Sequence, residues 1–423
     1  MRTHTKLFTP LFLLLLAASQ AFGAAGTLDP TFGNGGVVRP NVGSGNTFSF
    51  SDAAVAPNGD IVVSGTVNEP GIGYFAAIVR YLPNGTQDPS FGTNGVVILP
   101  PPASYFLGSS LTMAVAVQPN GEILTLFFAF NNTSTALENL LIRLKTNGTL
   151  DTTFGSGGAV ALNFPVPTSW GASATIVMAQ PDGKILLTGN VTPPFQKGST
   201  KVPLTLLARY LTSGAPDTSF GTGGLVEVVT PIDLPSTLAL LSGDALLAYN
   251  ATGQVAQFTS SGTLLAAASG GTIIATKDAG VLNGLAILPN NEFLAAGTIK
   301  GPDGKTNLDG VVERFELTGA LDTTYESPAI RFGSDAPEVK NEPQSLVVDS
   351  EERGLVGVEF VTAGGEVAGV ARLNPNGSLD TTFGTAGIGA TVSNFVLYRL
   401  IVQSNNEPVM IGGDGSLARY LAQ

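Results

Sequence analysis

Apolar residues occur along the chain in short runs that Gly, Asn, Asp and Pro interrupt. Pairs of these runs are joined by Asn-Gly or Asp-Gly, as at 53–65, 115–124 and 178–186. Asn-Gly and Asp-Gly tolerate the positive φ angles of a tight turn, so each pair predicts a β-hairpin. The runs are apolar almost throughout instead of alternating, which indicates strands packed on both faces.

A second pattern recurs after each hairpin. An apolar run with a central Arg leads through a turn to Asp-x-Ser/Thr-aromatic-Gly and a further short apolar run, as in 77–97. The Asp and the Ser or Thr can hydrogen-bond nearby backbone N–H groups, which indicates another turn. The aromatic residue is expected in the core. Every unit therefore holds four short strands.

Repeated units of four antiparallel strands, with a period of about sixty residues, are typical of β-propeller blades. We predict an all-β propeller of seven blades in a single domain, 24–423. Residues 28–39 are expected to add the missing outer strand to the last blade and to close the ring. The predicted blades span about 51–99, 113–162, 173–229, 236–277, 281–332, 343–392, and 397–423 plus 28–39.

These units resemble the bacterial delta-60 repeat family, whose repeats run from a Leu-Asp-x-x-Phe-Gly turn through a Pro-Asp-Gly hairpin to an Arg-Tyr strand. The resemblance is specific in six units. The fourth, about 234–275, departs from it because Gln257 replaces the Arg and no Asp-x-Thr-Phe-Gly follows. The resemblance implies an exported propeller-like protein, related in style to NHL and WD repeats, and it implies no particular activity.

In five units the Arg of the third strand lies eight residues before the Asp of the turn. A hairpin places two such residues side by side, and a buried Arg needs an acidic partner. Unit four lacks both members, with Gln257 and Leu265 at the equivalent positions, and Asp29 is the expected partner of Arg419. A ring of anion-binding sites is the alternative interpretation, which the repetition of the pairs disfavours. The predicted structural pairs are Arg80–Asp88, Arg143–Asp151, Arg209–Asp217, Arg314–Asp322, Arg372–Asp380 and Arg419–Asp29.

Residues 1–23 have the pattern of a secretory signal peptide, with Arg2 and Lys6 before an apolar run and small residues at the cleavage site. The run is too short to span a bilayer, and no Cys is present for a lipid anchor. We therefore expect a secreted or periplasmic protein without a membrane span. The net charge of −12, which becomes more negative without the leader, argues against a nucleic-acid partner.

The only His of the chain is His4, within the leader, and there is no Cys. Ser-His-Asp and Cys-His catalysis are therefore excluded in the mature chain, as is a zinc site with nitrogen or sulfur ligands. Acidic residues at 335–342 and 349–352 lack the alternating spacing of a calcium loop. We expect no cofactor, no metal and no catalytic residue.

Propellers usually bind ligands where the connections between blades, and those between second and third strands, converge at one end of the central channel. These connections are long here and contain aromatic residues, which can anchor a protein or stack on a sugar. The alternative is that the aromatic side chains cover the core. The predicted binding residues are Tyr105, Phe106, Trp170 and Phe195, with Phe48, Phe50 and Phe164 in the same group of loops.

Two functions follow from these patterns. The first is an exported, non-enzymatic and monomeric binding or scaffold protein that engages a protein or polysaccharide through the loop-rich face. The second is a carboxylate-dependent hydrolase or lyase of sugars or lactones, with or without Ca²⁺. Several acidic side chains converging on the channel would indicate the enzyme. The sequence shows no cluster that demands it and favours the binding protein.

Overall fold

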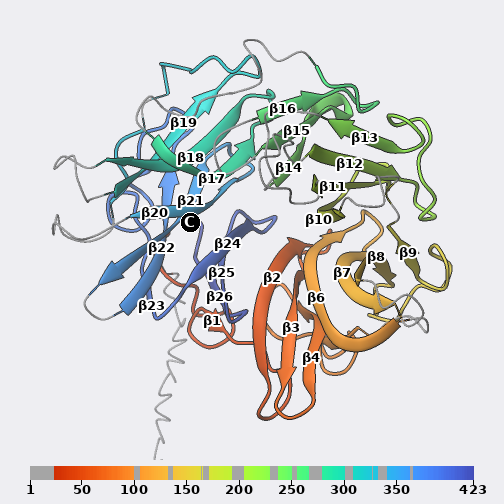
Figure 1. Ribbon diagram of the computed structural model, residues 1–423. Helices are drawn as coiled ribbons and strands as arrows, with labels where there is room; N and C mark the ends of the chain where they lie inside the picture. The colour runs from red at the N-terminus through yellow and green to blue at the C-terminus, as the bar shows by residue number, and fades with distance from the viewer. Residues whose placement is uncertain are drawn as a thin grey trace, which may run out of the picture.

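Seven antiparallel sheets surround a central axis in the computed structural model (Figure 1). The structure describes residues 23–99, 105–131, 137–162, 164, 171–192, 204–228, 237–249, 255–265, 279–300, 308–325, 327–331, 341–362 and 365–423. Within these ranges the regular structure is β-strand apart from one 3-10 turn, Ser242–Asp244. The predicted all-β propeller of seven blades is confirmed.

Blades 1 to 3 each contain four strands in chain order. Blade 1 consists of β2 (Thr47–Val55), β3 (Ile61–Glu69), β4 (Gly73–Tyr81) and β5 (Val96–Ile98). Blade 2 consists of β6 (Tyr105–Val117), β7 (Ile123–Asn131), β8 (Leu137–Leu144) and β9 (Ala159–Ala161). Blade 3 consists of β10 (Gly171–Ala179), β11 (Ile185–Thr192), β12 (Leu204–Tyr210) and β13 (Leu225–Val228).

Blades 4 and 5 show three strands each within the described residues. Blade 4 consists of β14 (Thr237–Leu240), β15 (Leu246–Tyr249) and β16 (Val255–Phe258). Blade 5 consists of β17 (Ala279–Ile287), β18 (Phe293–Lys300) and β19 (Leu308–Phe315). An isolated bridge between Gly310 and Ile330 takes the place of an outer strand in blade 5.

Blades 6 and 7 complete the ring. Blade 6 consists of β20 (Glu342–Val348), β21 (Gly354–Thr362), β22 (Gly365–Leu373) and β23 (Val392–Ser393). Blade 7 consists of β24 (Leu397–Val402), β25 (Pro408–Gly412), β26 (Leu417–Arg419) and, from the other end of the chain, β1 (Val37–Val38). Val37 pairs with Ala418 in antiparallel register. The predicted closure by the N-terminal strand is therefore confirmed.

In blade 7, residues after β26 and residues before β1 form one turn together. The other blades form the equivalent turn from a single continuous segment. Gly26 N donates to Leu421 O at 2.9 Å, and Leu421 N donates to Thr27 O at 3.0 Å. In blade 1, Gly85 N donates to Leu82 O at 2.9 Å within the corresponding turn. The last blade thus has the same turn geometry, assembled from both ends of the chain.

The described core lies between blades rather than inside them. Seven clusters of buried apolar residues each combine side chains from two neighbouring blades, and together they follow the whole ring. This arrangement explains why the strands are apolar on both faces, since each face of a sheet packs against another sheet. The cluster between blades 4 and 5 has the fewest buried members.

The first strand of a blade lines the channel, and in six of the seven described first strands the register shifts at a β-bulge. In β2 the shift falls between Phe50 and Asp52, and in β24 it falls between Leu397 and Arg399. A bulge re-aims the side chain that follows it. The two charged residues after these bulges form part of the site described below.

Candidate functional site

The structure brings all six Arg–Asp pairs together. In each, the Arg Nε donates to an Asp Oδ2, with distances of 2.7 to 2.9 Å. The second carboxylate oxygen accepts from the backbone N–H two residues further on, as from Ser90 N to Asp88 Oδ1 at 2.8 Å. Every Asp is therefore held from both sides, by the strand before the turn and by the turn itself.

Each Arg also joins its own blade to the next. Arg209 Nη1 donates to the carbonyl oxygen of Ser260 in blade 4, and the guanidinium lies 4.6 Å from the ring centre of Phe220. All six pairs make this carbonyl contact and this ring contact. We call the Arg, the Asp and the following aromatic residue the Arg–Asp–aromatic motif. Its contacts are those of a joint between blades, which leaves little of the guanidinium for a ligand.

The bonding within the motif lowers the pKa of the Asp carboxyls. For Asp217, burial acts in the opposite direction, but hydrogen bonds from Ser219 and the charge of Arg209 outweigh it and lower the pKa to about 2. In Asp322 the hydrogen bonds from Thr324 are the largest cause, and the pKa again falls to about 2. These carboxyls are held as carboxylates and are poor proton donors at neutral pH.

Blade 4 lacks the motif, as its sequence indicates. Gln257 pairs with Leu247 within the sheet, and Leu265 N donates to Gln257 O at 2.9 Å. A different contact joins blades 4 and 5, where Ser242 N donates to Asn291 Oδ1 at 2.9 Å. The joint between these blades therefore combines the smallest described core cluster with no Arg–Asp–aromatic motif.

The predicted binding aromatics are only partly within the described residues. Trp170 and Phe195 lie outside them. The sequence predicts Tyr105 and Phe106 in a loop, whereas their backbone belongs to β6, paired with Asn131 and Phe130. The sequence does not indicate that the strand begins this early, because Ser and Thr residues follow in β6 and the apolar pattern becomes clear only near residue 113.

The described aromatics of the same group are covered by the protein. Phe48 is 6 % exposed and belongs to the core between blades 7 and 1, against which half-buried Phe50 packs. Phe164 packs partly buried against the core between blades 2 and 3. For these three residues the core interpretation is correct.

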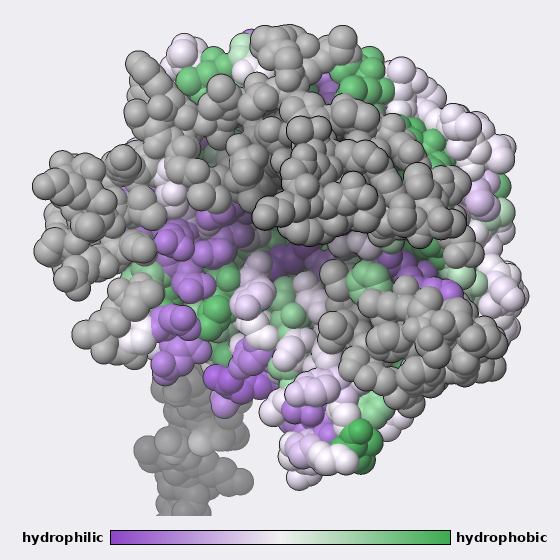
Figure 2. All heavy atoms as spheres, viewed as in Figure 1, coloured by the Kyte–Doolittle hydropathy of each residue, from purple (hydrophilic) through white to green (hydrophobic). Residues whose placement is uncertain are grey.

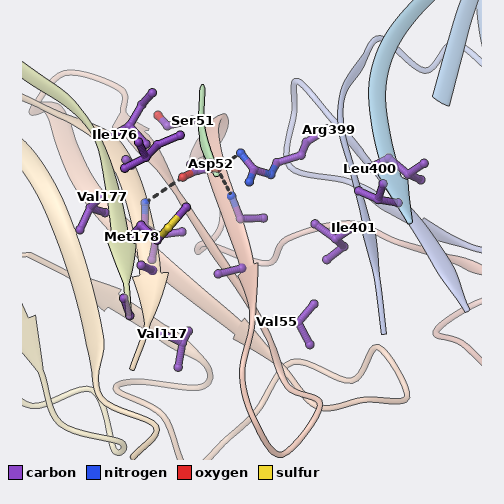
Figure 3. Close-up of a pocket in the computed structure, with 18 of the residues that line it drawn as sticks. Ser51, Asp52, Val55, Val117, Ile176, Val177, Met178, Arg399, Leu400 and Ile401 are labelled. Carbon is purple, nitrogen blue, oxygen red and sulfur yellow. Dashed lines mark hydrogen bonds and ion pairs between the residues drawn. The ribbon is translucent and has the colours of Figure 1, made fainter. Parts of the chain in front are cut away.

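A cavity of about 540 Å³ occupies the central channel. First strands of six blades line it, and Figure 3 shows their side chains on opposite sides of the space. Most lining residues are aliphatic, including Val55, Val117, Ile176 and Ile401. Figure 2 shows hydrophilic residues near the centre of the ring. The volume lies in the range of roughly 300–1,000 Å³ that small-molecule sites occupy.

Asp52 and Arg399 are the charged residues that line this cavity. Arg399 Nη1 binds Asp52 Oδ1, so the pair joins blade 7 to blade 1. Asp52 Oδ2 accepts from Val115 N of blade 2 at 3.0 Å, and Oδ1 accepts from Ala53 N at 2.8 Å (Figure 3). The carboxylate is thus fixed by partners from three blades, while the Arg399 side chain remains 47 % exposed.

Sequence reasoning missed this pair. The signal was available in the repeat itself, because the equivalent positions after the bulge in blades 2 and 3 are Ala114 and Ile176. Blades 5 and 6 have Gly284 and Ser345 there, so a charged residue at this position breaks the pattern of uncharged residues in the repeat. Two such breaks of opposite charge, in the first and last blades, point to a contact across the closed ring.

A second group of acidic residues lies in blade 6. Glu342 and Glu359 are direct partners across β20 and β21. Burial raises the pKa of Glu359, the hydrogen bond from Leu397 N to its Oε2 at 3.0 Å acts in the opposite direction, and the charges of Glu366 and Glu342 raise it further. None of these three residues lines the channel cavity.

Within the described ranges, no group of three or more His, Asp or Glu residues has the geometry of a metal site. A search of the same ranges finds no helix with the length and apolar character needed to cross a membrane.

Four stretches of the chain are similar to the family described as "Domain of unknown function (DUF5122) beta-propeller". The matched residues are 56–91, 128–154, 180–220 and 355–383. Each stretch ends at the aromatic residue of an Arg–Asp–aromatic motif, namely Phe91, Phe154, Phe220 and Phe383. The similarity therefore follows the repeats that build the joints between blades. No curated protein matches the chain significantly.

Among solved structures, the chain is similar to "Crystal structure of RRP9 WD40 repeats", with 10 % identity, 91 % of this chain and 96 % of that chain covered, and a TM-score of 0.50. It is also similar to "Structure of U3-55K" (11 % identity, 91 % and 98 % covered, TM-score 0.49). A third is "Crystal structure of WD40 beta propeller domain of Doa1" (13 % identity, 90 % and 98 % covered, TM-score 0.43). At these identities the likeness concerns the fold alone, and the chain is a β-propeller with repeats like those of a propeller family of unknown function.

Proposed function

We propose that the protein is an exported, non-enzymatic binding scaffold. The observation that carries the proposal is the chemistry of the channel cavity. Among the described residues that line it, the one carboxylate, Asp52, is committed to Arg399 and to two backbone N–H groups, and most of the remaining wall is aliphatic. Such a surface suits the binding of a ligand, whereas acid–base hydrolysis of a glycoside requires two carboxyl groups that flank the scissile bond.

The Arg–Asp–aromatic motifs support the same proposal. They use the repeated charged residues to hold the blades together, so the ring is a rigid frame around the cavity. A rigid frame keeps a binding surface ordered before its partner arrives, which reduces the entropy lost on binding. The loop connections that contain Trp170 and Phe195 remain the proposed contact region for a protein or polysaccharide partner at the rim.

Export is part of the proposal and rests on residues 1–23. The protein is expected in the periplasm or the medium after cleavage near residue 23, and mass spectrometry of the N-terminal peptide in fractionated cells measures this directly. A cytoplasmic protein that retains residues 1–23 would refute export without affecting the binding proposal.

The binding role is tested by retention of the mature protein on peptidoglycan, polysaccharide and envelope-protein arrays. Trp170→Ala with Tyr105→Ala is expected to reduce retention and to leave the melting temperature close to that of the parent. Leu321→Ala, which alters an exposed apolar residue in a turn of blade 5, is the control and should retain binding. Retention equal to the parent in the double variant would refute a role for these aromatics.

The alternative is a carboxylate-dependent hydrolase or lyase, and Glu359 is the observation in its favour. A partly buried carboxyl of raised pKa beside other carboxyls is the usual arrangement of a general acid. Assays on glycosides and lactones with the parent and Glu359→Gln decide between the two. Turnover that the substitution abolishes would refute the non-enzymatic proposal.

A further inference from the structure

The channel cavity has one polar end and a long aliphatic wall. The polar residues Ser51, Asp52, Thr175 and Arg399 lie at or beside the bulges of β2, β10 and β24, where the register shifts. From there the lining follows the first strands toward the hairpin turns through side chains such as Val55 and Val117 (Figure 3). The cavity is therefore amphipathic along its length.

Arg399 has hydrogen-bonding capacity that the described part of the chain does not use. A guanidinium carries five N–H donors. Among the described residues, the partner of Arg399 is Asp52, which binds Nη1, and Nε and Nη2 make no contact of this kind. Because Asp52 is itself fixed by Val115 N and Ala53 N, the guanidinium is held in place with donors available.

We propose that the central channel binds a ligand that carries a carboxylate on an apolar body, with Arg399 binding the carboxylate. This inference rests on the proposed binding function and names its ligand class. Arg binds carboxylates in bidentate geometry through two parallel N–H groups, and the free donors of Arg399 provide such a pair. The aliphatic wall then covers the apolar body, which gains free energy in proportion to the area removed from water.

The same geometry disfavours other ligands. A cation gains little from Asp52, because both of its oxygens already accept hydrogen bonds or an ion pair. A neutral sugar would bury several hydroxyl groups against a wall that offers few polar partners, and each unpaired hydroxyl is costly. A carboxylate with an apolar body satisfies the polar end and the aliphatic wall together.

Two sources supply this chemistry, a free fatty acid and the C-terminus of a peptide that ends in apolar residues. Calorimetry would compare octanoate with octanamide, and acetyl-Ala-Leu-Val as the free acid with the same peptide as the amide. We expect each acid that binds to bind about ten-fold or more tightly than its amide, since loss of a charge-assisted hydrogen bond costs that much. Whichever acid binds more tightly identifies the source.

Arg399→Gln is expected to abolish the difference between acid and amide. Arg39→Gln is the matched control, because Arg39 forms an exposed ion pair with Asp414 and does not line the cavity. The control should preserve the difference. Equal binding of acid and amide, an absence of binding by both acids, or an unchanged difference in Arg399→Gln would overturn the proposal.

The melting temperature of Arg399→Gln is measured alongside, since the ion pair with Asp52 also joins two blades. If this variant unfolds, Arg399→Lys and the acid–amide comparison on the parent decide the question. If the protein binds another partner but neither acid, the carboxylate site is refuted and the proposed binding function is not. Turnover of a glycoside that depends on Glu359 would refute the non-enzymatic function and leave the carboxylate site standing.

Discussion

Gly85 lies directly against Phe32 at the joint that closes the ring. A Cβ placed on Gly85 of blade 1 would come within 2.8 Å of Phe32 Cε2, which the N-terminal segment contributes to blade 7. Gly148 against Phe91 and Gly214 against Phe154 repeat this close approach at other joints. The Gly of this turn, in Asn84-Gly85, Asn147-Gly148 and Ser213-Gly214, therefore serves two needs, a positive φ and contact with the aromatic residue of the preceding blade.

Gly85→Ala is expected to destabilise the protein by about 2–4 kcal/mol, from backbone strain and from overpacking against Phe32. Gly71→Ala is the matched control, because both glycines have a φ of 81° and a Cβ on Gly71 meets nothing within 4 Å. The control should cost about 1–2 kcal/mol. Urea unfolding measures both, and equal losses would show that the contact with Phe32 contributes nothing.

Arg209→Ala and Asp217→Ala should each cost about 3–5 kcal/mol, because each removes the nearest ion-pair partner of a buried charge, and Lys184 Nζ lies further from Asp217 Oδ2, at 3.5 Å. The double variant is expected to cost clearly less than the two single losses combined. The exposed pair Arg39–Asp414 provides the comparison, and a double-mutant cycle on it should give a coupling free energy of about 0–1 kcal/mol. Strict additivity at Arg209 and Asp217 would contradict the joint described here.

Stability is expected to fall in acid through the motif carboxyls. The pKa of Asp217 is lowered from 3.8 to about 2, so its contribution is present above pH 3.8 and is lost as the pH falls through about 2. At pH 5, Asp217→Asn should have a lower free energy of unfolding than the parent. Between pH 4 and pH 2, its free energy of unfolding should fall less steeply than that of the parent. Unfolding curves for parent and variant that run parallel over this range would argue against the shift.

Blade 4 is expected to open before the other blades. Its boundary with blade 5 has the fewest buried residues among the described clusters and lacks the Arg–Asp–aromatic motif. Amide protons of β14 to β16 should therefore exchange faster than those of β2 to β4, which are bounded by complete joints. Hydrogen exchange followed by mass spectrometry measures this, and equal protection in blades 1 and 4 would refute it.

Much of the fold could be predicted because each repeat contains the residues that determine its own turns and strand pairing. The eight-residue spacing of Arg80 and Asp88 and the hairpin turn at Gly59 recur with little change, and the two ends of the chain complement each other as strands. The role of the Arg in joining one blade to the next was not predictable in this way, because its carbonyl partner, such as Ser260 for Arg209, lies in a different repeat.

The channel site was harder to predict for a related reason. Asp52 and Arg399 lie at opposite ends of the sequence, and only closure of the ring brings them together. The bulge in β2 interrupts the apolar pattern just before Asp52, so the pattern does not show that Asp52 lies within a strand. The β-bulge therefore has two effects. It makes the strand hard to recognise in the sequence, and it directs Asp52 into the channel.

The turn built from both ends of the chain has a mechanical consequence. A pulling force applied between residues 23 and 423 loads the pairing of β1 with β26, the contact of Arg419 with Asp29, and the hydrogen bonds from Gly384 N and Ala390 N of blade 6 to Ala25 O and Gly26 O. Gly26 and Leu421 lie side by side in one turn, so the described chain enters and leaves the ring at the same place. Tension between these two positions would load the contacts that close the ring.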